Sequence, residues 1–219
     1  RNIAATDYTF SGQSITILQN ASCEMEDCGS VIWVAGMHLL DWITASSDRK
    51  AIFHSRAVLE LGAGTGFVGI TLANSGAASV LLTDLPQQVS FLQLNMQANA
   101  AQQVHATALP WGSGVPPAVY EDNWDLIVGS DIAYDPELFE PLAMTLSALL
   151  RARPSAYALL ALGDRADFVD TSSETTRHDY DIFFDVAAKH GLEATQVGHV
   201  PIRPGSGDDF NTDIFTIRH

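Results

Sequence analysis

A glycine-rich stretch near residue 60 constrains the fold of this 219-residue chain more than any other feature. The segment LELGAGTGFVG runs from Leu59 to Gly69, with the strand-like run AVLEL before its glycines and the helix-like run FVGITLAN after them. Glycine is needed where a backbone turns sharply off a strand, lets a ligand approach and exposes the N–H groups that begin a helix. The stretch therefore predicts a strand–turn–helix unit that binds a ligand, in preference to a tight structural turn alone.

The glycines fit two ligand-binding patterns. Gly64, Gly66 and Gly69 have the spacing G-x-G-x-x-G of the dinucleotide fingerprint, whereas Glu60, Gly62, Gly64 and Gly66 have the spacing E-x-G-x-G-x-G that suggests methyl transfer. In the fingerprint the first glycine makes the turn at the end of the strand. Here the strand is expected to end just before Gly62, a glycine that the fingerprint leaves unused. The second pattern is therefore favoured.

Short apolar runs alternate with amphipathic stretches along the chain, which is typical of parallel strands joined by crossover helices. Runs such as VLLT and DLIVG are continuously apolar, as in strands covered on both faces. The expected strands are 57–61, 79–83, 104–108, 125–129, 156–162, 193–199 and 212–217, and the expected helices are 31–43, 66–74, 86–101, 136–150 and 180–190.

These elements predict an α/β fold, a doubly wound Rossmann-like sheet of seven strands that is mostly parallel with an antiparallel C-terminal strand. The turn-rich segment RPGSGDDFN, 203–211, favours a closing hairpin between the last two strands. Asp135 and Pro136 form a good helix start, with Asp as the N-cap and Pro in the first turn. Ligands of such sheets bind at the carboxyl ends of the strands, so the residues that follow each strand are the candidates for function.

The length and the absence of a linker favour a single domain over residues 1–219. Within it, residues 1–56 are expected to form an N-terminal extension and helix packed on a Rossmann-like core of residues 57–219. The chain begins at Arg1 rather than Met, which fits a trimmed leader or a truncated start.

The formal charge of −15 argues against nucleic acid as a partner, because nucleic-acid binding draws most of its affinity from neutralised phosphates. Lysine occurs only at Lys50 and Lys189, and the arginines form no basic stripe. An acidic surface attracts a basic partner, although the charge is equally explained by solubility alone. No apolar run is long enough to span a bilayer. We expect a soluble monomer of the cytoplasm, with the nucleus as an alternative, and no membrane partner.

Metal and disulfide chemistry are not indicated. Cys23 and Cys28 stand alone as C-x4-C, which favours two reduced thiols, and the seven histidines have no metal-ligand spacing. We therefore expect no metal site.

Asp84 ends the second expected strand, in LLTDLP, twenty residues after Gly64. A carboxylate in this place is suited to accept hydrogen bonds from ribose hydroxyls, and it does not distinguish between ribose-bearing cofactors. The ribose role is favoured over the alternative that Asp84 only caps the next helix.

The fourth expected strand ends in the segment DLIVGSDIAYDPE, where Ser130, Asp131 and Tyr134 leave the strand. A cationic amine is attracted both to a carboxylate and to an aromatic face. Asp131 and Tyr134 therefore offer a pocket for a cationic substrate group. The residues alone leave one alternative open, in which Asp131 caps a turn and Tyr134 packs against the rest of the protein.

Two tryptophans lie near the expected site. Trp33 falls in the apolar helical stretch VIWVAGMHLLDWI, where core packing is favoured, whereas Trp111 follows the third strand in a Pro/Gly-rich loop, where ligand contact is at least as well supported. For Arg165, at the end of the fifth strand, a surface salt bridge is favoured over a role in shaping the substrate entrance. The acidic run YEDNWD, 120–125, is expected to be a solvated loop.

Five segments, in this order, resemble the seven-strand S-adenosylmethionine-dependent methyltransferases of methyltransferase family 16, the lysine methyltransferase group. They are VIWVAGMHLLDWI, AVLELGAGTGFVGITLA, LLTDLPQQVSFLQLNMQAN, ATALPWG and DLIVGSDIAYDPELFEPL. The resemblance covers roughly residues 8 to 165, and DIFFDVAAKHGLEATQVGHV is similar to the closing helix and strand of the family. It implies the class I methyltransferase fold.

The resemblance also implies roles for individual residues. Trp33 matches the tryptophan that lies against the cofactor, and Trp111 matches the one beside the adenine. Asp131 and Tyr134 match the D-x-x-Y motif associated with binding of the lysine to be methylated. The expected cofactor-binding set also contains Glu60 from the favoured glycine pattern, Gly62, Ala63 and Gly64 under the methionine part, Asp84 at the ribose and Ser130 beside the cofactor.

The expected function is S-adenosylmethionine-dependent methyl transfer, with S-adenosylhomocysteine as the product. The expected acceptor is a lysine amine of a protein substrate, in a basic segment. The first alternative is a methyltransferase that acts on a small-molecule amine or on another protein side chain. An NAD-dependent oxidoreductase and a noncatalytic cofactor-binding adaptor are further alternatives, disfavoured by the glycine spacing and by the intact site residues.

Overall fold

We analysed a computed structural model of the chain, which describes residues 3–10, 12–20, 29–164, 168–169, 176–202 and 210–219. Its main sheet has seven strands in the order β10-β11-β7-β6-β3-β4-β5. These strands are β3 (Ala57–Leu61), β4 (Ser79–Asp84), β5 (Val104–Ala108), β6 (Leu126–Ser130), β7 (Tyr157–Gly163), β10 (Glu193–Val200) and β11 (Thr212–Arg218).

The strand directions confirm the fold predicted from the sequence. The central pairs β3-β4, β4-β5, β3-β6 and β6-β7 are parallel, whereas β11 runs antiparallel to both of its neighbours, β7 and β10. The chain leaves β3 toward β4 on one side and returns to β6 on the other side. This change of direction places the crevice for a ligand at the carboxyl ends of β3 and β6.

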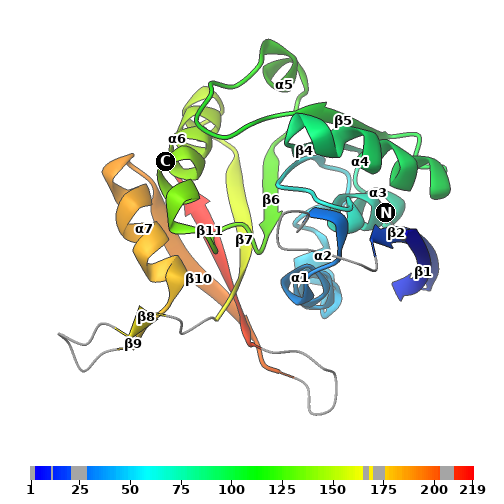
Figure 1. The fold of residues 1–219 in the computed structure, drawn as a ribbon, viewed down its shortest axis with the longest axis horizontal. Coiled ribbons are helices and arrows are strands. Elements are labelled where there is room, and N and C mark those ends of the chain that lie inside the picture. Colours follow the sequence, from blue (N-terminus) through cyan, green and yellow to red (C-terminus); the bar gives the residue numbers. More distant parts are fainter. Residues whose placement is uncertain (1–2, 11, 21–28, 165–167, 170–175, 203–209) are drawn as a thin grey trace.

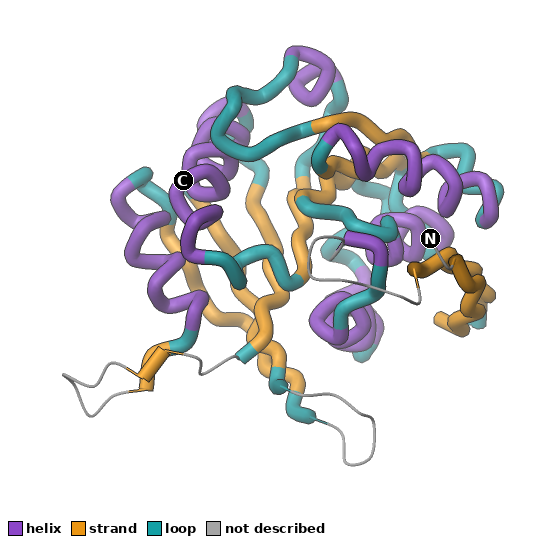
Figure 2. Tube along the Cα trace, viewed as in Figure 1, coloured by secondary structure: helices purple, strands orange, loops and turns teal. Residues whose placement is uncertain are grey.

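Helices cover both faces of the sheet (Figures 1 and 2). On one face, α1 (Val34–Thr44), α3 (Phe67–Asn74) and α4 (Pro86–Ala98) bury Leu39, Ile70 and Leu92 in one core. On the other face, α5 (Pro117–Glu121), α6 (Pro136–Ala152) and α7 (Asp179–Lys189) contribute to a second core. Strand residues alternate between the two cores, with Val58 in the first and Leu59 in the second. The short helix α2 (Ser47–Lys50) follows α1.

An N-terminal hairpin, β1 (Ile3–Phe10) and β2 (Gln13–Asn20), was not predicted. It lies beside α3 and α4 and is not part of the main sheet (Figure 1). Ile15 and Ile17 of β2 are fully buried in the core that contains Ile70 of α3. Their alternation with polar residues is a strand signal that was present in the sequence. A second small pair, β8 (Phe168–Val169) and β9 (Thr176–Arg177), is also separate from the main sheet.

Two helix boundaries differ from the predicted ones. The predicted helix 31–43 begins at Val34, because Trp33 has an extended backbone and forms the N-cap. The predicted helix 86–101 ends at Ala98, and Ala100 has a φ of 48° that an α-helix does not accept. Helix α6 starts as predicted, since the Asp135 side chain accepts the N–H of Glu137 at 2.9 Å.

The prediction of a solvated loop at 120–125 holds for the exposed residues 122 and 123 but was wrong for the helical residues 120–121 and for Trp124. Residues 120 and 121 belong to α5, and Trp124 is only 1% exposed. The indole N–H of Trp124 donates to the carbonyl of Val119 at 2.8 Å, and the Arg153 guanidinium lies over the indole ring, 4.8 Å from its centroid. Trp124 was not recognised as a core residue because its neighbours in the sequence are acidic.

Candidate functional site

A cavity of about 350 Å³ opens at the carboxyl ends of β3, β4 and β6. It has the size and the largely apolar lining that are usual for cofactor sites. All ten candidate residues from the sequence line this cavity: Trp33, Glu60, Gly62, Ala63, Gly64, Asp84, Trp111, Ser130, Asp131 and Tyr134. The structure thus brings together residues from Trp33 to Tyr134 of the chain.

The glycine loop has the register favoured above. Strand β3 ends at Leu61, and Gly62, Gly64 and Gly66 have φ angles of 60°, 55° and 78°, a region that glycine adopts without strain. A Cβ atom on Gly62 would lie 2.8 Å from Cγ2 of Ile132 and 3.2 Å from the Trp111 ring. Gly66 is the N-cap of α3. These glycines form the turn and open the helix, whereas the dinucleotide fingerprint would leave Gly62 without a role.

Glu60 lies under this loop as a buried carboxyl group. Its Oε2 atom accepts the N–H of Gly69 at 2.7 Å, and a Cβ on Gly69 would lie 2.4 Å from that oxygen. Burial raises the pKa of Glu60 to about 8, and the hydrogen bond from Gly69 opposes this shift only in part. Glu60 therefore joins the floor of the cavity to the first turn of α3.

Asp84 holds the glycine loop from the end of β4. Its Oδ2 atom accepts the N–H of Gly64, and its Oδ1 atom accepts the N–H of Leu85, both at 2.7 Å. Burial raises the pKa of Asp84 in spite of both hydrogen bonds. The N-cap of α4 is Leu85, and no side chain caps this helix, so the alternative that Asp84 only caps a helix is not observed. An ionised carboxylate has about four acceptor positions, which leaves room for ligand hydroxyls.

The end of β6 contributes three residues to the lining of the cavity. Ser130 is the last residue of this strand, and Asp131 and Tyr134 follow it. Asp131 is 7% exposed and has a φ of 57°, an unusual backbone angle for a residue other than glycine. Its N–H donates to the carbonyl of Ala161 in the neighbouring β7 at 2.8 Å. Tyr134 is 45% exposed, so the alternative that it packs into the core is not observed. The buried acid and the exposed ring line the same cavity.

The two tryptophans also line the cavity, and the expectation of core packing for Trp33 was wrong. Trp33 is 42% exposed because it precedes the first turn of α1 and does not lie on the buried face of that helix. Trp111 is half-buried next to Gly62 and lines the cavity, so contact with a ligand stays a prediction.

The ionisable groups of the described lining are all acidic. Glu60, Asp84 and Asp131 line the cavity, and its described residues contain no Lys, Arg or His. Because Glu60 keeps its proton below about pH 8, Asp84 and Asp131 are the lining groups that would attract a cationic ligand or a ligand with a cationic group. Sequence reasoning missed Gly29, Thr65 and other lining residues, which carry no motif of their own.

Some predicted features fall outside the described residues, namely Cys23, Cys28, Arg165 and most of the connection 203–211. Among the described residues, no group of three or more His, Cys, Asp and Glu side chains is placed to hold a metal ion. No helix in the described ranges has both the length and the apolar character needed to cross a membrane.

Comparisons with known proteins identify the family. A family model described as lysine methyltransferase matches residues 10–179. EEF1A lysine methyltransferase 3 of Mus musculus is 33% identical over 152 residues, which cover 68% of this chain and 62% of that protein. Protein N-lysine methyltransferase METTL21A of Danio rerio is 36% identical over 125 residues, 55% of each chain. The chain therefore spans less than two thirds of the length of either relative.

Solved structures support the fold. The magnesium protoporphyrin IX methyltransferase of Synechocystis PCC 6803, solved with bound SAH, superposes with a TM-score of 0.56 at 15% sequence identity. The superposition covers 91% of this chain and 90% of that protein.

Proposed function

Because this chain belongs to the lysine methyltransferase family, we propose that it transfers a methyl group from S-adenosylmethionine to a lysine side-chain amine of a protein substrate. The observation that carries the proposal is that a glycine loop, the Asp84 carboxyl group at the end of β4 and the Asp131–Tyr134 pair all line one cavity. We further propose that residues 1–219 act as one methyltransferase domain.

The residues present fit this cofactor. The lining combines three carboxyl groups with a glycine loop in which a Cβ on Gly62 would crowd the lining residues Ile132 and Trp111. In the proposed arrangement, Gly62, Ala63 and Gly64 lie under the methionine part, and Glu60 supports that loop from below. Asp84 accepts hydrogen bonds from the ribose hydroxyls. The remaining contacts are Trp111 beside the adenine, and Trp33 and Ser130 against the cofactor.

Methyl transfer requires the protein to align the methyl donor with the acceptor nitrogen. When bound, S-adenosylmethionine supplies a methyl group made electrophilic by the positive charge of its sulfonium. The lysine ammonium group has to lose one proton before transfer, and the chain then has to align the uncharged nitrogen with that methyl group. We assign the orientation of the amine to Asp131, whose buried carboxylate attracts the ammonium form and accepts a hydrogen bond from the N–H of the uncharged amine. Tyr134 forms one wall of the lysine channel through its exposed ring.

The substrate class follows from the family and from charge. Two relatives bear names of protein-lysine methyltransferases, and the net charge of this chain is −15. A strongly acidic protein attracts basic segments, which are also rich in lysine. We therefore propose a basic segment of a protein as the substrate. Nucleic acid fits this charge poorly.

The function is tested by incubating the protein with S-adenosylmethionine that carries a labelled methyl group, together with a cell extract, followed by mass spectrometry of the labelled species. We expect methylated lysine in a protein band, and label confined to nucleic acid or to small molecules would contradict the proposed substrate. Calorimetric titration with S-adenosylhomocysteine and with NADH tests the cofactor. Binding of NADH alone would favour the oxidoreductase alternative.

Substitutions at Asp131 and Tyr134 test the proposed mechanism. Asp131→Ala is expected to lower the rate of methyl transfer by about 100-fold, because the amine loses its orienting carboxylate, while affinity for S-adenosylhomocysteine is retained. Tyr134→Phe keeps the ring and is the matched control, with a loss below about tenfold. Full activity of Asp131→Ala on the true substrate would remove Asp131 from the mechanism.

A further inference from the structure

Three amide side chains, two in α4 and one at its C-cap, lie between the glycine loop and the N-terminal hairpin. They are Gln88, Asn95 and Asn99, whose spacing of seven and four residues repeats at nearly whole turns of a helix. Building on the proposed function, we propose that Gln88 and Asn95 are positioning residues that hold the glycine loop in its cofactor-binding shape, with the β1–β2 hairpin as their second anchor.

Asn95 connects the loop directly to the hairpin. This side chain is fully buried, and its Nδ2 atom donates to the carbonyl of Thr65 at 2.8 Å and to the carbonyl of Leu18 at 3.2 Å. Its Oδ1 atom accepts the N–H of Leu18 at 2.7 Å. Thr65 lies between Gly64 and Gly66 and lines the cavity. The Asn95 amide group therefore donates both to the glycine loop and to β2.

Asn99 binds the hairpin but not the loop. Its Oδ1 atom accepts the N–H of Thr16 at 2.9 Å, and its Nδ2 atom donates to the carbonyls of Thr16 at 2.7 Å and Asn95 at 2.8 Å. Four residues of an α-helix span about 6 Å, and two residues of a strand span about 6.8 Å. This match lets Asn95 and Asn99 pair with Leu18 and Thr16 along the edge of β2, as a neighbouring strand would.

Gln88 holds the loop from the first turn of α4. Its Nε2 atom donates to the carbonyl of Gly64 at 3.0 Å and to the carbonyl of Gly29 at 2.6 Å. Gly29 and Gly64 both line the cavity. The Gln88 side chain is buried and spans the space between these two segments of the lining.

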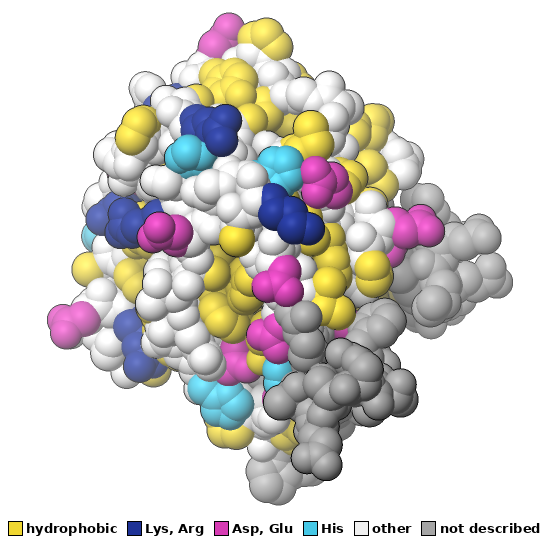
Figure 3. Space-filling model, turned by 90° about the vertical axis from the view of Figure 1, so that its left-hand side faces the viewer, with side chains coloured by type: hydrophobic (Ala, Val, Ile, Leu, Met, Phe, Trp, Pro, Cys, Tyr) yellow, Lys and Arg dark blue, Asp and Glu magenta, His cyan; other side chains and the backbone are white. Residues whose placement is uncertain are grey.

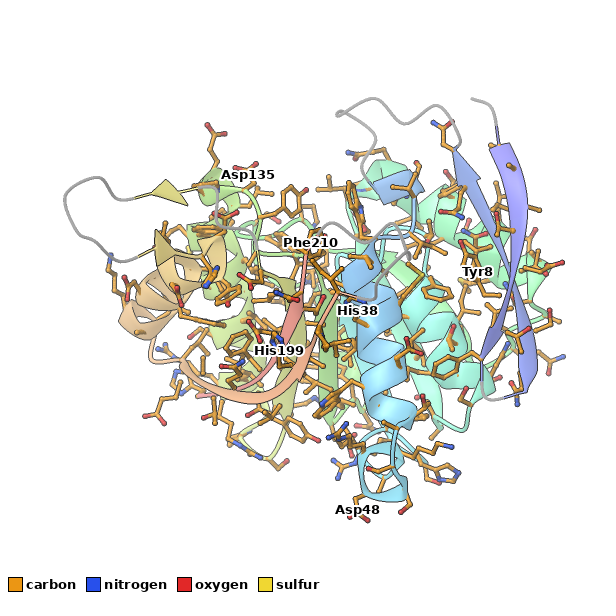
Figure 4. All side chains as sticks on the ribbon, turned by 90° about the horizontal axis from the view of Figure 1, so that it is seen from below. Tyr8, His38, Asp48, Asp135, His199 and Phe210 are labelled. Carbon is orange, nitrogen blue, oxygen red and sulfur yellow. The ribbon has the colours of Figure 1, made fainter. Side chains whose placement is uncertain are left out.

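The hairpin also contacts other parts of the site. The Gln19 side chain accepts the N–H of Ile32, a lining residue, at 2.8 Å and donates to the Tyr8 hydroxyl at 2.9 Å. Tyr8 of β1 packs against α3, with its ring centroid 5.1 Å from that of Phe67, a residue that lines the cavity (Figure 4). The hairpin thus reaches the site from two sides of the loop.

These contacts account for the shape of the loop. The N–H of Ala63 donates to the Thr83 carbonyl, the N–H of Gly64 donates to Asp84, and the carbonyls of Gly64 and Thr65 accept from Gln88 and Asn95. A buried carbonyl that loses its donor is costly, so the loop would move to recover one. A loop that must be reordered by its ligand binds that ligand more weakly. The chemical step would be affected much less, because neither amide reaches the reacting groups.

The test compares Asn95→Ala and Gln88→Ala with Asn99→Ala, the matched control at the C-cap of the same helix. We expect Asn95→Ala and Gln88→Ala each to raise the Kd for S-adenosylhomocysteine and the KM for S-adenosylmethionine by about tenfold, with kcat within about twofold of the unchanged protein. Asn99→Ala is expected to lower the melting temperature as Asn95→Ala does, while Kd and KM remain within about twofold.

The outcomes separate the two proposals. If the unchanged protein does not bind S-adenosylhomocysteine, the proposed function fails, and the loop role fails with it. If it binds and both test variants bind equally well, only the positioning role is overturned. Equal weakening by Asn99→Ala would also overturn it, since Asn99 has no contact with the loop. Should Asn95→Ala not fold, Gln88→Ala decides the question by the same measurement.

Discussion

Glu60 makes stability depend on pH at the scale of one residue. Its pKa is about 8 in the folded protein and 4.5 as the reference value, because burial disfavours the charged form. Between these values the folded state keeps a proton that the unfolded chain has released. The free energy of unfolding therefore falls as the pH rises through this window. Glu60→Gln keeps the shape without the titration, and it is expected to remove on the order of a few kcal/mol of that pH dependence.

Urea unfolding from about pH 5 to about pH 9 measures this effect. Glu137→Gln, at an exposed position in the first turn of α6, is the control and should keep the pH profile of the unchanged protein. A Glu60→Gln profile that falls as steeply as that of the unchanged protein would show that Glu60 is not the titrating group.

Which candidate residues were predictable depends on whether their signal is local. Asp84 is the last residue of β4, and Asp131 comes directly after β6. Because ligands bind at the carboxyl ends of strands, both residues could be predicted as candidates. The position of Trp33 depended on where α1 begins, which apolar periodicity does not determine. Gln88 and Asn95 bind backbone groups far away in the chain, and no local pattern marks a side chain for such a contact.

At the scale of elements, the N-terminus of α6 offers a test of helix capping beside the site. The Asp135 carboxylate accepts the N–H of Glu137 and interacts favourably with the positive end of the helix. Asp135→Ala is expected to lower the free energy of unfolding by about 1 kcal/mol, measured by urea denaturation. Asp122→Ala, which removes an exposed acid that follows α5, is the matched control and should change it by less than about 0.5 kcal/mol. Equal losses would mean that the cap contributes nothing specific.

Four strands of the main sheet, β3, β4, β6 and β7, could be predicted because each is a short, strongly apolar run. Strands β5 and β10 are more polar, and their prediction rested on the alternation of strands and helices along the chain. The hairpin was missed because IAATDYTF has few apolar residues and is almost entirely exposed, and because the alternation in its partner strand is short, with Ile15 and Ile17 as its fully buried residues. The edge of β2 that does not pair with β1 receives hydrogen bonds from Asn95 of α4 and from Asn99 at its C-cap. These contacts join residues that are far apart in the chain, so no local pattern in the sequence indicates them. Helix α5 has only five residues, too few for a periodic signal.

At the scale of the whole molecule, charge is expected to govern the encounter with the substrate. The chain carries a formal charge of −15, and on the face in Figure 3 its few basic side chains are interspersed with acidic ones. Raising the salt concentration from about 0.02 M to about 0.3 M shortens the reach of these charges severalfold. The kcat/KM for a basic protein substrate should fall by about tenfold as a result.

Steady-state kinetics at the two salt concentrations measures this change. The Kd for S-adenosylhomocysteine is the internal control, because this ligand has no net charge, and it should change by less than about twofold. A kcat/KM that does not respond to salt would mean that the acidic surface serves solubility alone.

Strand β11 lies between β7 and β10 in the sheet, yet it follows both of them in the chain. During synthesis, therefore, β7 and β10 leave the ribosome before the strand that joins them exists. Within the described sheet β10 pairs only with β11, so β10 cannot be added earlier, and β7 keeps an open edge until Thr212–Arg218 has emerged. An open edge invites pairing with other unfinished chains. Strands β7, β11 and β10 therefore come together in one late step. Before that step the edge of β7 is open, and nascent chains are most prone to aggregate during this interval.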